Sequence, residues 1–313
     1  MPYTKQELLN VDFYTEFIDD LRNNYKDEMI KVVVENIKIF CTSVKKVGYF
    51  DNFFPTIQMV GLGDNVFPDS WIKTNNQKNI STKFYSYADL IAQYYVWKNL
   101  LDNYDEKQWI GFSQYRRFWL KHKISKTYPL NSIDDIILTE PDPSWKNYDA
   151  IIPAPFFFKK KIKDLKNIFS INSFKDINFF KYRITVEKQF RESLGNLGAE
   201  IISDIIKLLP DKDQVGFKEF LANRNHLSAH GMYISRKNII KSYSEFLFSW
   251  FEKCEGIINR NNNLPLLQNR RIFQYINERF LDYWMNKNVK TLCWPIAMYN
   301  SEKKIITSIG KIN

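Results

Sequence analysis

Cysteine and histidine are scarce in this chain. The 313 residues include three cysteines, Cys41, Cys254 and Cys293, and three histidines. Such an odd, scattered set of cysteines excludes a disulfide scaffold. His226 and His230 are four residues apart, but no third ligand type accompanies them, so a zinc enzyme is not expected.

The signatures of several enzyme and nucleic-acid-binding classes are also missing. The sequence has no P-loop, no Gly-x-Gly-x-x-Gly, no Gly-x-Ser-x-Gly, and no helix-turn-helix or RNA-binding signature. No apolar run approaches the ~18 residues that span a bilayer, and the first residues carry no basic-then-apolar signal. We therefore expect a cytoplasmic protein, either free or peripheral to the inner membrane.

Apolar and basic residues, in contrast, are abundant. Hydrophobic residues make up 44% of the sequence, enough for a sizeable core, and the formal net charge is +10. A basic surface suits nucleic acid, an anionic membrane or a phosphorylated substrate. The clearest basic cluster, Phe156-Phe-Phe-Lys-Lys-Lys161 followed by Lys163 and Lys166, either rests on an anionic bilayer or forms an ordinary exposed loop.

Predicted strands alternate with helices from residue 37 to about 155. Apolar runs bounded by turns predict strands at 37–41, 56–60, 109–112 and 149–152, with a helix at 87–100. This alternation predicts an α/β fold with a mainly parallel sheet. Ligands of such sheets bind at the carboxyl ends of the strands, where Thr42, the 61–64 turn and the 114–117 segment are expected.

The rest of the chain is predicted to be mainly helical. Residues 1–35 form an added helical extension, 36–285 the α/β domain with a helical insertion at about 160–224, and 286–313 a tail. A short strand at 232–235 precedes two long amphipathic helices at 239–258 and 270–285. The expected architecture is thus an α/β core with a helical C-terminal part.

Two adjacent arginines, Arg116 and Arg117, follow the predicted strand at 109–112. Arginine at the end of a buried strand is costly unless an anion meets it, and the guanidinium fork suits phosphate. The pair therefore indicates a diphosphate site. The alternatives are that both arginines pair with surface carboxylates or are simply solvated.

A metal cofactor is not expected at this strand end. Nucleotide-sugar transferases of the α/β type usually hold a divalent metal with an Asp-x-Asp after a central strand, which is absent here. Two fixed cations can neutralise a leaving diphosphate directly. As an alternative, Asp64 and Asp69 could form a divalent-metal site elsewhere in the chain.

Four segments stand out in chain order: Pro55-Thr-Ile-Gln-Met-Val-Gly61, Asn79-Ile-Ser81, Tyr94-Tyr-Val-Trp-Lys-Asn99 and Gly111-Phe-Ser-Gln-Tyr-Arg-Arg-Phe118. Looser matches follow at Ala229–Arg236 and Arg271–Phe280. Together these segments resemble bacterial capsule and O-antigen glycosyltransferases with a His-Tyr-Arg-Arg motif, some of which are galactofuranosyltransferases. The resemblance covers about residues 36–285. It implies a GT-A-like nucleotide-sugar-binding core and an inverting transfer.

The sequence departs from that family pattern at several positions. Gln114 replaces the histidine of the motif, and Asp89 replaces a glutamate. Ile91, Tyr95 and Gln274 stand where the pattern has threonine, tryptophan and glycine. Both arginines remain while their neighbours change, so donor or acceptor choice is expected to differ from that of known members.

The resemblance implies a role for each matching residue. The donor-binding residues would be Thr42, Gly61 and Asp64 at the base and ribose, Asn79 and Asp89 at ribose or sugar hydroxyls, and Tyr115, Arg116 and Arg117 at the diphosphate. His230 and Gly231 would lie near the acceptor. Alternatively, Asp89 is a helix-surface acid and His230 a structural histidine.

An inverting transfer needs a general base for the acceptor hydroxyl, normally a carboxylate. Glu278 is the first candidate because it lies beside Arg279 in a predicted helix near the last matching segment. The alternative for Glu278 is a structural ion pair with Arg279. Asp149, at the start of the strand predicted at 149–152, is the second candidate.

The sequence therefore predicts a glycosyltransferase. It would move a sugar from a nucleotide-sugar donor, preferably a UDP-sugar, to a capsular polysaccharide, an O-antigen or a lipid-linked glycan. The residues alone indicate an anion-binding α/β site, and the resemblance supplies the substrate class. Two alternatives stay open: a non-catalytic scaffold of polysaccharide assembly whose activity was lost through Gln114, and a nucleic-acid-binding protein with a steep salt dependence. The favoured function involves no nucleic-acid partner.

Overall fold

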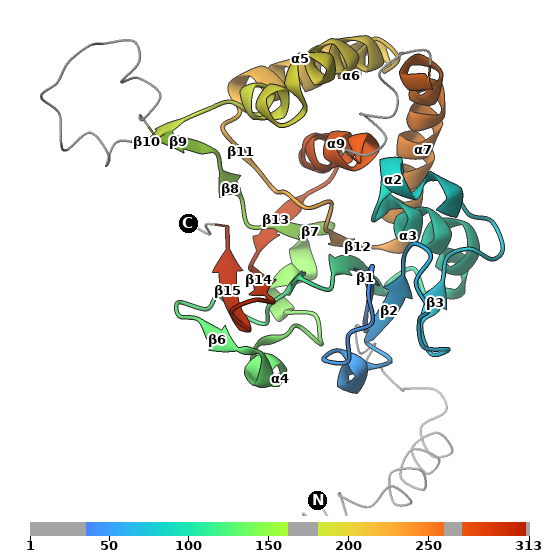
Figure 1. Ribbon diagram of the computed structural model, residues 1–313, viewed down its shortest axis with the longest axis vertical. Helices are drawn as coiled ribbons and strands as arrows, with labels where there is room; N and C mark the ends of the chain where they lie inside the picture. The colour runs from blue at the N-terminus through green and yellow to red at the C-terminus, as the bar shows by residue number, and fades with distance from the viewer. Residues whose placement is uncertain (1–35, 162–180, 260–270, 311–313) are drawn as a thin grey trace, which may run out of the picture. The chain divides into compact units, whose positions relative to one another are not determined.

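A mixed β-sheet forms the centre of the domain (Figure 1). The computed structural model describes residues 36–161, 181–259 and 271–310. Parallel strands β3 (Ile72–Lys73), β2 (Ile57–Gly61), β1 (Ile37–Ser43) and β4 (Trp109–Gln114) lie side by side. β12 (Ile234–Ser235) runs antiparallel between β4 and β7 (Ala150–Pro153), and β13 (Thr291–Trp294) is parallel to β7. The predicted α/β fold with a mainly parallel central sheet is confirmed.

The C-terminal residues extend this sheet. β5 (Arg117–Trp119) pairs antiparallel with β4, and β14 (Ile296–Asn300), β15 (Ile305–Ile309) and β6 (Tyr128–Pro129) follow in order. The segment 286–313, expected as a tail, thus supplies β13, β14 and β15. These strands are short and partly exposed, with Ile296, Ala297 and Ile306 buried, so their apolar signal is weak. The α/β domain therefore continues past residue 285.

Close packing of the central strands depends on glycine at one position. A Cβ at Gly111 of β4 would lie 2.7 Å from the side chain of Ile234 on β12. Any larger residue would therefore push the two strands apart. On β1, Phe40 packs on the helical side of the sheet, and Ile39 and Cys41 pack on the other. Since both faces are covered, β1 is apolar at every position from Ile37 to Cys41 except Lys38.

Long helices cover one face of the sheet (Figure 1). They are α5 (Val186–Ile206), α6 (Asp211–Asn223), α7 (Lys237–Asn259) and α9 (Ile272–Asn288). Helix α5 begins after Thr185, whose hydroxyl accepts a hydrogen bond from the Lys188 backbone N–H. Helix α7 buries Ile240, Tyr243 and Leu247 at helical spacing. The other face is covered by a smaller layer that includes Trp71, Trp145 and α4 (Ile133–Ile136).

The insertion is only partly helical. Before α5 begins, β9 (Lys159–Lys161) pairs with β10 (Lys181–Arg183). The flanking strands β8 (Phe156–Phe157) and β11 (His226–Leu227) pair with each other. The rest of the insertion at 162–180 and the predicted extension at 1–35 lie outside the described residues. The remaining short helical turns are η2 (Asp51–Phe53), η3 (Ser81–Lys83), η5 (Leu101–Asn103), η6 (Leu130–Ser132) and η7 (Pro143–Asn147).

The helix predicted at 87–100 is interrupted. It divides into α2 (Phe84–Tyr87), α3 (Leu90–Tyr95) and a π-helical turn, η4 (Val96–Leu100). The break falls at Ala88, which has φ 48° and ψ −121°. Apolar residues on both sides of the break keep the helical spacing, so the sequence pattern does not reveal it. The consequence is that Asp89 stands at the start of α3 rather than within a helix.

Candidate functional site

Polar side chains converge where β1 and β4 end on the helical side of the sheet. We call this group the Asp89 cluster; its members are Thr42, Asp89, Gln114, Arg117, His230 and Glu278. Thr42 is the last residue but one of β1, and Gln114 ends β4. Asp89 stands at the start of α3 and Arg117 at the start of β5. His230 lies in the loop before β12, and Glu278 lies on α9. Segments far apart in the sequence therefore meet at the carboxyl edge, as expected for an open α/β sheet.

Asp89 and Gln114 form the hydrogen-bonded centre of the cluster. The Thr42 hydroxyl donates to Asp89 Oδ1 at 2.6 Å, and Gln114 Nε2 donates to Asp89 Oδ2 at 2.9 Å. Gln114 Nε2 also donates to the His230 carbonyl oxygen at 3.1 Å. Arg117 donates to Gln114 Oε1 at 2.8 Å. The Gln114 amide thus links the Asp89 carboxylate to the Arg117 guanidinium, which do not hydrogen-bond each other directly.

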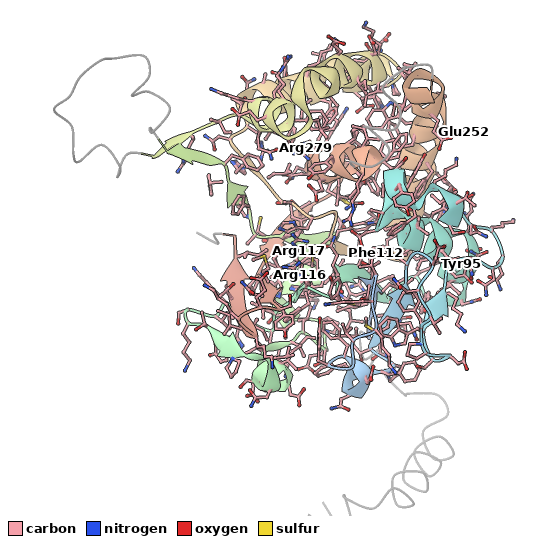
Figure 2. The ribbon with its side chains drawn as sticks, in the orientation of Figure 1. Tyr95, Phe112, Arg116, Arg117, Glu252 and Arg279 are labelled. Carbon is pink, nitrogen blue, oxygen red and sulfur yellow. The ribbon has the colours of Figure 1, made fainter. Side chains whose placement is uncertain are left out.

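The β4–β5 hairpin gives its two arginines different positions (Figure 2). Gln114 and Arg117 are cross-strand partners, so their side chains share a face of the sheet. Arg117 is half-buried, and its Nε is buried without a hydrogen-bond partner among the described residues. Arg116 is exposed at the turn, with its Nε 3.5 Å from the Tyr299 carbonyl oxygen. The predicted pair is therefore one arginine inside the cluster and one beside it.

Tyr115 occupies the same turn. Its carbonyl oxygen accepts a hydrogen bond from the Tyr49 hydroxyl at 2.5 Å. Its ring lies under the Lys45 ammonium, 5.6 Å from the ring centroid. These contacts help to fix the turn between β4 and β5; the predicted role of Tyr115 at the diphosphate stays a prediction.

Charges inside the cluster influence one another. Burial raises the pKa of Asp89, against the opposing effects of the Thr42 hydrogen bond and of Arg271 and Arg117. Burial likewise raises the pKa of Glu278, while Arg279 and Arg117 oppose the rise. Arg117 is the cation that acts on both carboxylates. A buried carboxyl with a raised pKa beside a cation is typical of catalytic acids and bases.

His230 is held in place by its backbone. Its N–H hydrogen-bonds the Glu278 carboxylate, and its carbonyl oxygen accepts from Gln114. Burial and the nearby charge of Arg117 lower the pKa of the His230 ring to about 3, so the ring is neutral near pH 7. Gly231 follows with φ +61°, and a Cβ there would lie 2.7 Å from Gln274 Nε2. Glycine is therefore required at this close approach to α9.

Backbone strain gathers around the same cluster. Ala88, His230 and Arg271 have φ values of 48°, 80° and 53°, a region that residues other than glycine seldom adopt. Ala88 precedes Asp89, His230 belongs to the cluster, and Arg271 acts on the Asp89 carboxylate. Such conformations cost about 1–3 kcal/mol each and concentrate at functional sites. Their grouping here is independent support for function.

Glu278 also contacts Arg279. Their charged groups are 3.5 Å apart, but Arg279 is 2% exposed and donates at 2.7 Å to the Tyr275 carbonyl oxygen and also to Gln189. Arg279 is therefore fixed mainly by its own helix and by α5. The ion pair that the sequence offered as an alternative exists, yet it leaves the Glu278 side chain 20% exposed.

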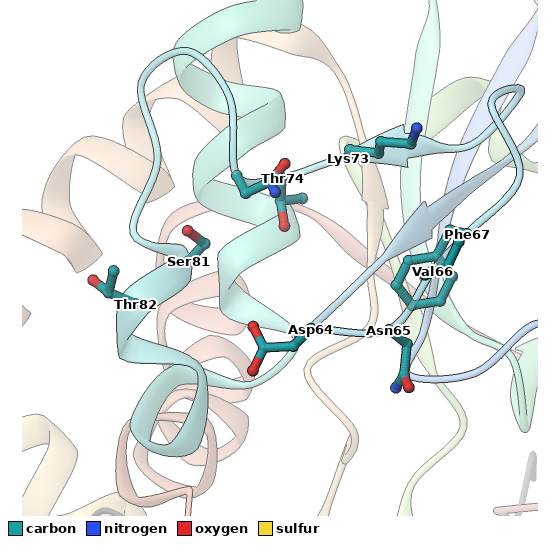
Figure 3. A pocket seen from close by; sticks show the side chains of 10 residues that line it. Asp64, Asn65, Val66, Phe67, Lys73, Thr74, Ser81 and Thr82 are labelled. Carbon is teal, nitrogen blue, oxygen red and sulfur yellow. The ribbon is translucent and has the colours of Figure 1, made fainter.

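A pocket of about 460 Å³ lies beyond the ends of β2 and β3 (Figure 3). Asp64 and Ser81 lie on either side of it, and Thr74 also lines it. Asn79 contributes indirectly, since its Oδ1 accepts hydrogen bonds from the Ser81 N–H and hydroxyl. Gly61 acts through packing, because a Cβ there would lie 2.3 Å from the Phe67 ring. We call this the β2 pocket.

Asp149 lies at the opposite edge of the sheet. The Lys290 N–H donates to Asp149 Oδ2 at 2.8 Å, just before β7 begins. Ser235 of β12 pairs with both Ala150 of β7 and Ile110 of β4, so Ala150 lies at the height of Ile110, near the start of β4. Four residues at ~3.3 Å each place that level about 13 Å from the Gln114 end. Asp149 is thus separated from the cluster, and the candidate base from this strand is not retained.

The central position of Gln114 in the cluster was not predicted from the sequence. Gln114 appeared only as a departure from a motif, whereas it contacts three other members of the cluster. Its spacing of three residues from Arg117 across a two-residue turn was the available signal. Among the described residues no group of three or more His, Cys, Asp or Glu side chains could hold a metal ion.

The sequence matches a family model described as Domain of unknown function (DUF4422) over residues 38–289. The chain belongs to the DUF4422 family. The matched range contains every member of the Asp89 cluster and ends at the last residues before β13. No curated protein matches this DUF4422 chain.

Among solved structures, the DUF4422 protein is similar to the apo structure of WbbM, a bifunctional glycosyltransferase, with a TM-score of 0.51 and 18% sequence identity. The match covers 89% of this chain and 47% of WbbM, so the chain spans about half the length of that protein. The likeness shows a shared fold. No helix in the described part of the DUF4422 chain is both long and apolar enough to cross a membrane.

A buried acid anchors the loop that carries His230 in this DUF4422 protein. Asp282 on α9 accepts a hydrogen bond from the Ser228 N–H at 2.8 Å, and burial raises its pKa from 3.8 to about 6. The folded state thus binds this proton more tightly than the unfolded chain, so stability from this group is greatest below pH 4 and falls as pH rises through 6. The shift from 3.8 to about 6, at 1.36 kcal/mol per pKa unit, corresponds to a loss of about 3 kcal/mol in the free energy of unfolding.

Replacing Asp282 with asparagine should remove that dependence. Urea unfolding of wild type and Asp282→Asn between pH 4 and 7 would measure it as a difference between the two slopes. Parallel slopes would show that Asp282 ionises in the folded state as it does in the unfolded chain.

Proposed function

We propose that this DUF4422 protein is a glycosyltransferase that uses a nucleotide-sugar donor. The observation that carries the proposal is Arg117: its Nε is buried without a hydrogen-bond partner in the described part of the chain, at the carboxyl edge of a parallel sheet. A buried guanidinium N–H without a hydrogen-bond partner favours an anionic ligand. Glu278 and Asp89, both with raised pKa values, lie within its influence. A fold shared with a glycosyltransferase supports the same function.

The donor would extend along the edge of the sheet. Its nucleoside would occupy the β2 pocket near Asp64 and Ser81, and its diphosphate would reach Arg117 with Arg116 beside it. β2 and β5 are separated by β1 and β4, so three strand spacings of ~4.8 Å give a span of about 14 Å. A nucleoside diphosphate can bridge such a span. We favour a UDP-sugar and a metal-independent site in which the arginines balance the leaving charge.

The chemistry would be an inverting displacement. Glu278 removes the proton of the acceptor hydroxyl, whose oxygen then bonds to the anomeric carbon while the bond to the diphosphate breaks. The nucleoside diphosphate leaves with the electron pair, and Arg117 stabilises its charge. His230, neutral near pH 7, lies beside Glu278 and Gly231 on the acceptor side.

The acceptor we favour is a capsular polysaccharide, an O-antigen or a lipid-linked glycan. This proposal rests on the resemblance to the His-Tyr-Arg-Arg motif family, including its galactofuranosyltransferases. We propose a cytoplasmic enzyme, either free or peripheral to the inner membrane. The substrate class rests on that resemblance, whereas the anion site rests on geometry.

Thermal unfolding with UDP, GDP, CDP and dTDP, each with magnesium and with EDTA, tests the donor site. At 100 times its Kd a ligand adds about 2.7 kcal/mol of stability, which raises Tm by several degrees. We expect UDP alone to raise Tm, equally in EDTA. A rise only with magnesium would contradict the metal-independent site. No rise with any nucleotide would contradict the transferase and favour the assembly scaffold or a nucleic-acid-binding protein.

A further inference from the structure

A separate pocket of about 410 Å³ lies between η3, α3, η4 and α7. We call it the α7 pocket. Tyr94, Trp97 and Phe248 form an aromatic wall, and Glu245, Glu252 and Glu255 of α7 also line the pocket. Figure 2 shows Glu252 on α7, away from Arg116 and Arg117. None of these residues belongs to the Asp89 cluster or to the β2 pocket.

The aromatic wall is rigid. Trp97 stacks on Phe248 with ring centroids 5.6 Å apart and an angle of 6° between the planes. Tyr94 meets both rings edge-on, at 5.7 Å and 5.0 Å. Phe248 is buried, whereas Tyr94 and Trp97 are half-buried. The wall therefore presents a fixed, partly exposed apolar surface, which loses little entropy when a ligand covers it.

The polar lining of the pocket supplies both hydrogen-bond donors and acceptors. Glu255 accepts from Lys83 and from the Tyr87 hydroxyl, each at 2.6 Å, so its position is fixed. Glu245 and Glu252 are exposed and keep free lone pairs. Lys83 and Lys98 line the same pocket, so its charges nearly balance. A ligand with many hydroxyl groups and little charge suits this mixture better than a strong anion or cation.

Lys98 covers the Trp97 ring. Its ammonium lies 3.5 Å from the ring centroid. At an exposed site such a contact contributes only about 0.5–1 kcal/mol, and the lysine stem is flexible. A flat, weakly polar ring face can take the place of this ammonium on Trp97. Lys98 then becomes a donor at the edge of the bound ligand.

We propose that the α7 pocket binds sugar residues of the acceptor glycan at a distance from the transferred sugar. A sugar ring combines an apolar C–H face, which packs on Trp97 and Tyr94, with hydroxyl groups that donate to Glu245 and Glu252. The pocket adjoins the cluster, because Tyr87 lines it and Asp89 is two residues further along the chain. Tyr85, on the same helix α2, is 64% exposed, and its carbonyl oxygen accepts a hydrogen bond from the Arg271 N–H. The proposal rests on the transferase function proposed above.

An array of purified bacterial capsular and O-antigen polysaccharides, with their oligosaccharide fragments, tests this pocket. Wild type should bind at least one oligosaccharide. Glu252→Gln and Trp97→Ala should each weaken that binding about tenfold, equivalent to 1.4 kcal/mol. Lys253→Gln is the matched control, because Lys253 is the exposed neighbour of Glu252 and does not line the pocket. Circular dichroism checks the fold, and Glu252→Gln keeps the test valid if Trp97→Ala unfolds.

UDP-induced thermal shifts in the same variants separate the two proposals. Unchanged UDP shifts with weakened glycan binding support the α7 pocket. Glycan binding that depends on Glu252 without any UDP shift also supports the pocket, and contradicts only the donor site. No array binding by wild type, or equal binding by wild type and Glu252→Gln, overturns the inference.

Discussion

Replacing Arg117 with alanine is expected to lower sugar transfer by about 100- to 1000-fold while the domain stays folded. The substitution removes the cation that we propose faces the leaving diphosphate and that also acts on the Asp89 and Glu278 carboxylates. Initial rates of nucleotide release from the donor, with far-UV circular dichroism of each variant, would measure the effect. Arg117→Lys keeps the charge but not the two-pronged geometry, so it should fold and still lose most of the activity.

Arg116→Ala is the matched control for that prediction. Arg116 is the adjacent residue, equally charged, but it is exposed and directed toward Tyr299. We expect its loss to reduce activity far less than the loss of Arg117. Equal losses would mean that total charge matters rather than position. A folded, active Arg117→Ala variant would refute the diphosphate role.

Replacing Glu278 with glutamine is expected to reduce turnover by about 100- to 10,000-fold without reducing UDP binding. The amide is nearly the same size as the carboxyl but cannot accept the acceptor proton. Because burial raises the pKa of Glu278 above its usual 4.5, the wild-type rate should increase as pH rises through that pKa and then level off. Steady-state rates across pH would show this limb in wild type and its absence in Glu278→Gln.

Asp149→Asn provides the comparison for Glu278→Gln. Asparagine keeps the oxygen that accepts from the Lys290 N–H, and the residue lies at the far edge of the sheet. Its activity should stay near that of wild type. Full activity in Glu278→Gln, or an equal loss in Asp149→Asn, would remove Glu278 as the general base.

The sequence predicted much of this arrangement because the buried strands have strong apolar signals. β1, β4 and β7 are buried along nearly their whole length, and their carboxyl ends mark the edge where Thr42 and Arg117 lie. Asp89, His230 and Glu278 came from the family resemblance, and the structure brings all three together. Their individual roles in binding and catalysis stay predictions.

Other features depend on details that apolar periodicity does not record. The break at Ala88 is a matter of backbone conformation. Arg117 and Arg116 differ in position because only Arg117 pairs across the strands with Gln114. Asp149 was placed correctly at the start of its strand, but residues that precede β7 lie at the edge of the sheet opposite the cluster. The weak signal of β13 to β15 arises because these strands bury few residues. Each difference is thus a matter of local geometry or of partial exposure.

The Asp89 cluster draws Thr42 from the first described strand and Glu278 from the last described helix. During synthesis on the ribosome, the half-site made by β1, α3 and the β4–β5 hairpin emerges long before α9. An emerging chain would therefore lack the proposed base until α9 has been made and packed. If the proposed function holds, a nascent chain would not transfer sugar before α9 has packed against the rest of the cluster.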